Sequence, residues 1–91
     1  MKVFHPHPAL IEFVPATCGK EAHPNGTQYR VAIGMEIWGA TNAQVLKVQL
    51  VDSEGSVLGR RSPSFPLHSD DFARIERAAK RLLGKAGKLA M

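Results

Sequence analysis

The feature that most constrains the fold is a stretch, from Tyr29 to Trp38, in which apolar residues occupy every second position. Successive side chains of a β-strand point to opposite faces of a sheet, so this period of two predicts a strand with one face on a core. The core face carries Tyr29, Val31, Ile33, Met35 and Ile37, and the other face carries Arg30, Ala32, Gly34, Glu36 and Trp38.

The same pattern returns further along the chain and predicts an antiparallel meander. Between residues 45 and 52, Leu46, Val48 and Leu50 share one face, and Lys47 and Gln49 share the other. Residues 52–55, Asp-Ser-Glu-Gly, have the composition of a tight turn, with glycine where a left-handed residue is needed. We therefore expect residues 56–61 to return as the next antiparallel strand.

From Ser69 onward the period is that of an amphipathic helix. Ser69 is a suitable N-cap, and Asp70 and Asp71 place negative charge in the first turn, where the helix dipole favours it. Gly84 and Gly87 each cost about 1 kcal/mol relative to alanine, so residues 84–91 are expected to form a frayed basic tail. The apolar arc contains Phe72, Ile75, Ala79, Leu82 and Leu83, and the opposite arc, expected to be solvated, contains Arg74, Arg77 and Arg81.

The 91 residues fit one domain. Residues 1–27 read as an irregular N-terminal arm rich in proline and histidine, with one short strand over 9–14 between Pro8 and Pro15. Residues 28–83 hold the meander and the helix. The predicted fold class is α+β: an antiparallel β-meander of about four strands with one C-terminal amphipathic helix.

Composition restricts the partners without choosing one. Hydrophobic residues make up 44% of the chain, which excludes wholesale disorder, and the net charge of +4 admits nucleic acid, an acidic protein or an anionic surface. Pro6 and Pro8 interrupt any secretory signal, and the apolar runs are too short to span a bilayer. With a single cysteine, Cys18, no intramolecular disulfide is possible. We expect a cytoplasmic protein that does not contact membranes.

The candidate catalytic and metal-binding residues form no recognised pattern. His5, His7, Cys18 and His23 are ligand types that zinc accepts, but their spacing matches no compact zinc site. A nucleophilic pair of Cys18 and His23 lacks a third, orienting group, and the carboxylates are scattered. The sequence therefore predicts no catalytic residue, metal or cofactor, and we expect a protein that is not an enzyme.

Basic and aromatic residues carry the strongest functional signal. Arg30 and Trp38 share the face of the first strand that points away from the core, and Lys47 occupies the equivalent face of the next. Arg60 and Arg61 stand at the end of the third strand. Sheets of this kind bind single-stranded nucleic acid by pairing cations with phosphates and stacking bases on aromatic rings. An ordinary solvated sheet face remains the structural alternative.

The order of these parts resembles the single-strand-binding domain of the positive-cofactor-four transcriptional coactivators. Gly59, Arg60 and Arg61 match a glycine and two basic positions of that family, Leu67 matches the leucine of a short apolar strand, and Phe72 matches an aromatic residue in the first turn of the helix. The resemblance covers roughly residues 29–83. It implies a curved four-stranded sheet, a C-terminal helix and a homodimer that binds single strands or melted duplex.

A homodimer is also expected from surface area. One short helix cannot cover a four-stranded sheet, and a two-fold partner is the commonest way to bury the apolar surface left over. The predicted function is therefore that of a small protein that binds single-stranded DNA in transcription or DNA metabolism. The alternative is a protein-interaction module, such as a small adaptor or inhibitor of phage or plasmid origin.

Overall fold

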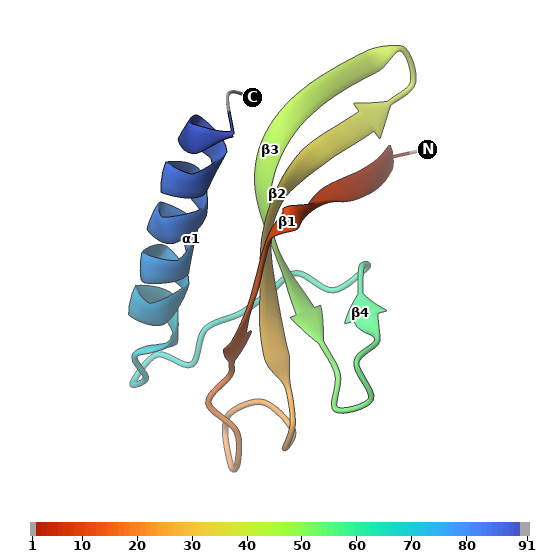
Figure 1. Ribbon diagram of the computed structural model, residues 1–91. Coiled ribbons are helices and arrows are strands. Elements are labelled where there is room, and N and C mark those ends of the chain that lie inside the picture. The colour runs from red at the N-terminus through yellow and green to blue at the C-terminus, as the bar shows by residue number, and fades with distance from the viewer. Residues whose placement is uncertain (1, 90–91) are drawn as a thin grey trace.

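The computed structural model describes residues 2–89, which form a curled four-stranded antiparallel sheet with one helix against it (Figure 1). The predicted α+β meander with a C-terminal helix is confirmed. The strands follow one another in the sheet in chain order. The elements are β1 (Lys2–Pro15), β2 (Gln28–Trp38), β3 (Thr41–Val51), β4 (Val57–Leu58) and α1 (Asp71–Lys88).

The alternating strand of the sequence is the centre of the fold. β2 pairs with β1 on one side and with β3 on the other, and its pairing with β3 runs without a shift from Gln28 opposite Val51 to Trp38 opposite Thr41. The helix packs over β1 and β2 and leaves the opposite face of the sheet uncovered (Figure 1). The buried core between sheet and helix consists of Leu10, Val14, Tyr29, Val31, Ile33, Leu50, Ile75, Ala78 and Leu82.

The expectation of an irregular arm is wrong for residues 2–15, which form the long edge strand β1. An edge strand pairs on one side only, so it tolerates prolines whose missing N–H faces outward. The register shifts between Pro6 and Ile11, which absorbs the irregular stretch. Gly34 permits this arrangement, because a Cβ atom there would lie 2.2 Å from the carbonyl oxygen of His5.

The expectation of a frayed tail is wrong for residues 84–88, which continue α1. A Cβ atom added at Gly84 or Gly87 would meet nothing within 4 Å, and Ala86 packs against the core. The packed face therefore holds the last turns in place while both glycines face open space. Residues 90 and 91 of the predicted tail lie outside the described residues. Within residues 2–89, no helix combines the length and the apolar character needed to cross a membrane.

The packed face of α1 is rotated relative to the predicted apolar arc. Ile75, Ala78 and Leu82 are buried, whereas Phe72 and Leu83 are more than half exposed. The helix packs mainly over two strands, so a narrower stripe than the full arc reaches the core.

The opposite arc of arginines is not simply solvated as predicted. Arg81 forms an ion pair with Glu12 of β1 at 2.8 Å. Arg74 donates to the backbone oxygen of Pro15 at 2.6 Å and pairs with two acidic residues at the start of the helix. Two of the three arginines therefore tie α1 to the end of β1.

The strand predicted over residues 56–61 corresponds to β4 and is shorter than expected. It comprises Val57 and Leu58 alone, where residues 56–61 were predicted. Residues 59–70 contain no strand, and Leu67, which the resemblance places in one, lies in a turn with 88% of its surface exposed. Pro63 and Pro66 cannot donate to a ladder. Phe65, between them, instead packs its ring 5.2 Å from that of Tyr29.

Candidate functional site

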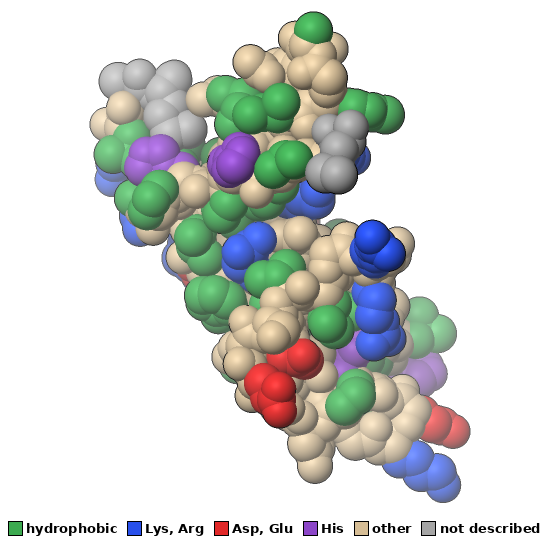
Figure 2. Space-filling model, turned by 90° about the vertical axis from the view of Figure 1, so that its right-hand side faces the viewer, with side chains coloured by type: hydrophobic (Ala, Val, Ile, Leu, Met, Phe, Trp, Pro, Cys, Tyr) green, Lys and Arg blue, Asp and Glu red, His purple; other side chains and the backbone are tan. Residues whose placement is uncertain are grey.

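The strands bring Arg30, Trp38 and Lys47 onto one face of the sheet, opposite the helix. Arg30 and Trp38 are separated by an even number of positions on β2, and Lys47 of β3 stands opposite Ala32, which shares their face. Figure 2 views the molecule from the side opposite the helix and shows Lys and Arg side chains among hydrophobic ones. We call this surface the open face.

β1 adds three residues to the open face that sequence reasoning did not assign. Lys2 pairs with Trp38, Phe4 with Glu36 and Phe13 with Arg30 in the β1–β2 register. Phe13 is 54% exposed and Trp38 is 66% exposed. These residues were missed because the prolines and the register shift interrupt the period of two in β1. The alternation of Lys2 and Phe4 with their neighbours was the available signal.

Glu36 stands between the two lysines of the open face. Lys47 Nζ lies 2.8 Å from one carboxylate oxygen of Glu36, and Lys2 Nζ lies 3.5 Å from the other. The hydrogen bond from Lys47, helped by the charge of Lys2, holds the pKa of Glu36 below its ordinary value. The acid stays ionised and neutralises part of the positive charge around it.

Both lysines also lie over aromatic rings. Lys2 Nζ is 5.4 Å from the ring centre of Trp38, and Lys47 Nζ is 5.3 Å from that of Phe4. Cations at this distance from a ring face are attracted by its quadrupole. Each lysine is thus held between Glu36 and one aromatic ring, which keeps its charge on the open face.

Arg30 occupies the other end of the open face. Its Nη2 donates to Oε1 of Gln49 at 2.6 Å. Its Nε is buried and has no hydrogen-bond partner among the described residues. Phe13 stands opposite Arg30 in the β1–β2 register, so a second cation and aromatic residue lie near each other on the open face, away from Glu36.

Arg60 and Arg61 lie outside the sheet. Both are exposed and belong to the irregular segment that follows β4. Arg61 lines a hollow of about 260 Å³ together with His23, Ser64 and Phe65. The predicted site thus divides into three residues on the open face and two in this loop.

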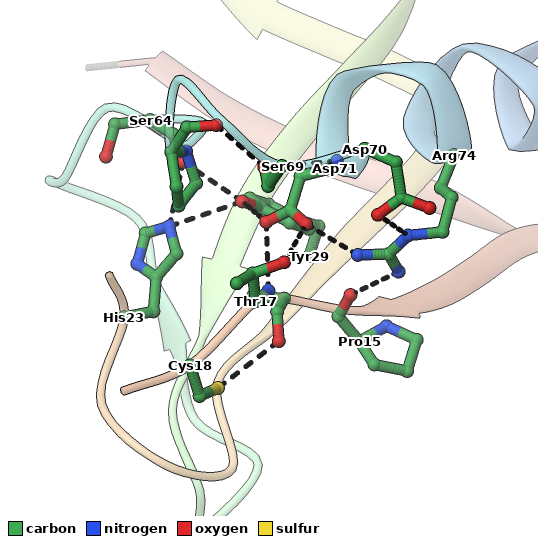
Figure 3. Close-up of polar contacts among 12 residues, drawn as sticks. Pro15, Thr17, Cys18, His23, Tyr29, Ser64, Ser69, Asp70, Asp71 and Arg74 are labelled. Atoms are coloured by element: carbon green, nitrogen blue, oxygen red, sulfur yellow. Dashed lines mark hydrogen bonds and ion pairs between the residues drawn. The ribbon is translucent and has the colours of Figure 1, made fainter. Parts of the chain in front are cut away.

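A second polar cluster, centred on Asp71, lies at the start of α1 (Figure 3). Asp71 is fully buried. Its carboxylate accepts hydrogen bonds from the backbone N–H and the hydroxyl of Thr17, at 2.9 and 2.6 Å, and from the Tyr29 hydroxyl at 2.6 Å. Arg74 Nη2 donates to it at 2.5 Å. The sequence placed Asp71 correctly in the first turn but gave no sign of Thr17, which is 54 positions away.

The Asp71 cluster extends to the segment before the helix. His23 Nε2 lies 2.8 Å from the backbone oxygen of Ser64, and the Tyr29 hydroxyl lies 3.1 Å from the same oxygen. A carbonyl oxygen only accepts hydrogen bonds, so Nε2 of His23 is the donor in this contact. The cluster therefore joins the 16–27 loop, β2 and the segment before α1.

The contacts in this cluster lower the pKa of Asp71 and raise the pKa of Tyr29. Burial raises the pKa of Asp71, but the hydrogen bonds from Thr17 and Tyr29 and the charge of Arg74 outweigh it and lower the pKa to about 2. Burial, followed by the hydrogen bond and the charge of Asp71, raises the pKa of Tyr29 well above its ordinary value. An ionised Asp71 and a protonated Tyr29 make a stable lock between loops rather than a proton-transfer pair.

The zinc-ligand types named above are dispersed. His5 and His7 lie on β1, Cys18 Sγ donates to the backbone oxygen of Ala16 at 3.2 Å, and His23 belongs to the Asp71 cluster. Among residues 2–89, no group of three or more His, Cys, Asp or Glu side chains is placed to hold a metal ion.

The sequence matches no family model, no curated protein and no solved structure. The resemblance to the positive-cofactor-four family therefore stays a prediction.

Proposed function

We propose that this protein binds single-stranded nucleic acid, single-stranded DNA in particular, on the open face of its sheet. One observation carries the proposal: Phe4, Phe13 and Trp38 share a face with three cations, and two of these rings are more than half exposed. The three cations are Lys2, Arg30 and Lys47.

The physical basis is the combination of stacking and charge. Every base has a flat apolar face, so exposed rings on a sheet bind bases of any sequence, and nearby cations pair with the phosphates between them. An ordinary solvated face of an antiparallel sheet is mainly polar and does not display large rings beside cations. The exposed Phe13 and Trp38 favour a binding surface over this alternative.

Glu36 limits the affinity of the open face for phosphate groups. Lys2 and Lys47 are both engaged by its carboxylate, so a phosphate must compete with Glu36 for each of them. The replacement Glu36→Gln removes the competing charge and keeps the shape of the side chain. It is expected to tighten binding, whereas loss of a purely structural ion pair would not.

The test is a fluorescence-anisotropy titration with a labelled oligothymidine at several salt concentrations. If the open-face cations Lys2, Arg30 and Lys47 and the loop residues Arg60 and Arg61 each neutralise one phosphate, log K against log salt falls with a slope near −3.5 per protomer, at about 0.7 per phosphate for single strands. Glu36→Gln is expected to raise the affinity and to steepen the slope. Trp38→Ala is expected to weaken binding by about 1–3 kcal/mol with little change in slope.

The two loop arginines have a matched control on the helix. The double variant Arg60→Ala with Arg61→Ala is expected to flatten the slope by about 1.4. Replacing Arg77 and Lys80, both exposed on α1, by alanine removes the same amount of charge from the helix instead of the loop after β4. This variant is expected to leave the slope nearly unchanged. Equal effects of the two double variants would reduce the interaction to net charge alone.

Absence of oligonucleotide binding at low salt by the folded wild type would reject the proposal. The open face would then fit the alternative, a protein-interaction module, because the same exposed rings and cations suit a protein partner.

A further inference from the structure

The two edges of the sheet are protected to very different degrees. The edge strand β1 carries Pro6, Pro8 and Pro15, and proline blocks the addition of another strand. On the other side, β4 pairs with Leu50 and Val51 only. The rest of β3 contains no proline and, in Figure 1, extends upward beyond the reach of β4. One edge is closed to strand addition and the other is open.

The backbone groups on the open edge can be assigned from the register. The N–H of Asp52 donates to Ser56 at 3.0 Å, toward the β4 side. In an antiparallel sheet the backbone N–H and C=O groups of successive residues point alternately to the two neighbouring strands. The β2–β3 pairing continues without a shift, so the even-numbered residues of β3 all point these groups away from β2. No turn, loop or cap hydrogen bond among residues 2–89 reaches these groups. The free positions are Asn42, Gln44, Leu46 and Val48.

The helix leaves the first half of the same strand mostly exposed. α1 packs over β1 and β2, and between its last turns and β3 lies a groove of about 300 Å³. Ile33, Leu46, Leu83 and Ala86 are among the residues that line it. Leu46 is 37% exposed. An apolar groove therefore runs directly beside the open edge.

We propose that the open edge of β3 is a dimer interface, in which a second copy of the chain adds its own β3 antiparallel about a two-fold axis at Val45. This register places Gln44 opposite Leu46 of the second copy, so that the free even-numbered positions of one strand face those of the other. The free backbone N–H and C=O groups of each β3 then form hydrogen bonds with the same groups of the second copy, as an isologous interface requires. The two sheets become one continuous sheet.

The charges of the segment permit this self-pairing. Lys47 is the only charged residue between Thr41 and Val51, and its ammonium group is already paired with Glu36. In the proposed register Lys47 stands opposite Ala43 of the second copy, so no like charges face each other. Leu46 of the second copy reaches the helix side of the sheet beside the groove, which covers apolar surface that one helix leaves open. The proposal does not depend on nucleic-acid binding.

The first test is disulfide cross-linking in a Cys18→Ser background. In this register Val45 stands directly opposite Val45 of the second copy, in a non-hydrogen-bonded pair. The two Cα atoms of such a pair are about 4.5 Å apart, which is within the range of a disulfide. Val45→Cys is therefore expected to give a covalent dimer under mild oxidation. Ala43→Cys, offset from its copy by about 13 Å along the strand, is expected to stay uncross-linked.

The second test is the mass in solution. Sedimentation equilibrium of the wild type is expected to give twice the monomer mass of 9.9 kDa. Gln44→Pro removes an N–H that points to the open edge and no bond to β2, so it is expected to halve the mass, whereas Gln44→Ala keeps the dimer. Leu46→Lys places a charge beside the two-fold axis and is expected to halve the mass as well. This second variant does not require the strand to accept a proline.

Two results would overturn the proposal. A wild type that stays at monomer mass up to its solubility limit shows that the edge does not pair. A dimer in which Val45→Cys fails to cross-link, or in which the folded Leu46→Lys variant keeps the dimer mass, shows that another surface is used. Circular dichroism of each variant confirms that the sheet and helix are intact.

Discussion

Asp71 and Glu36 are both acids that pair with cations, yet they differ in burial and in the kind of partner. Asp71 is fully buried and receives donors from Thr17, Tyr29 and Arg74. Glu36 lies on the open face and pairs with the ends of two flexible lysines. The first arrangement joins loops that are distant in sequence, and the second holds charges on an outer surface.

The comparison shows that burial, rather than residue type, decides what an acid contributes. A buried carboxylate that loses a partner leaves an uncompensated charge or donor in a medium of low polarity, which is costly. The ion pairs of Glu36 are only partly buried, with 17% of its side chain exposed, and both lysines remain in contact with water. Water and salt compete with such pairs, so their loss costs less than the loss of a fully buried one. If the open face binds nucleic acid as proposed, the same difference lets a phosphate compete with Glu36 for its two lysines.

The largest expected effect follows from removing the buried acid. Asp71→Ala removes the buried acceptor that Thr17, Tyr29 and Arg74 share, although Arg74 keeps Asp70 and the backbone oxygen of Pro15. It is expected to lower the free energy of unfolding by about 3–5 kcal/mol. Asp70→Ala is the matched control, because Asp70 pairs with the same Arg74 from an exposed position. Its effect is expected to stay below about 1 kcal/mol in urea unfolding. Equal losses would contradict the distinction between the two regions.

A smaller effect is expected from protonating the same group. The pKa of Asp71 is lowered to about 2 in the folded protein, below its ordinary value of 3.8. A depressed pKa contributes stability that is present above the unfolded value, near pH 4, and is lost as the pH falls toward 2. At about 1.4 kcal/mol per pKa unit, the contribution is roughly 2 kcal/mol.

Urea unfolding between pH 5 and pH 2, about where such groups titrate, separates Asp71 from the other carboxylates. The wild type is expected to lose more stability over this window than Asp71→Asn, which has no proton to bind there. Parallel curves for the two proteins would show that Asp71 is not the group responsible.

The smallest effect is expected on the open face. Glu36→Gln keeps the shape of the side chain and breaks two ion pairs whose lysines are partly exposed, so the free energy of unfolding is expected to change by about 1 kcal/mol or less. Asp71→Asn, the same chemical change in the buried cluster, is the reference. A loss at Glu36 as large as that at Asp71 would mean that the open face stabilises the fold, and would weaken its assignment as a binding surface.

Local period was enough to predict part of this molecule. The alternation from Tyr29 to Trp38 identified β2, and with the pattern around Lys47 it identified the face shared by Arg30, Trp38 and Lys47. A helix after Ser69 also followed from its period. These features could be predicted because each depends on spacing within one element, which the sequence displays directly.

Tertiary structure decided the rest. β1 runs through its prolines because it is an edge strand and because Gly34 admits its backbone, and neither fact is local to β1. The role of Asp71 depends on Thr17, 54 positions away, and on Tyr29, 42 positions away. Contacts over such separations are selected by how the helix packs on the sheet. No periodicity within one segment records that packing. The sequence therefore displayed β2, β3 and the helix, but neither the full length of β1 nor the buried cluster around Asp71.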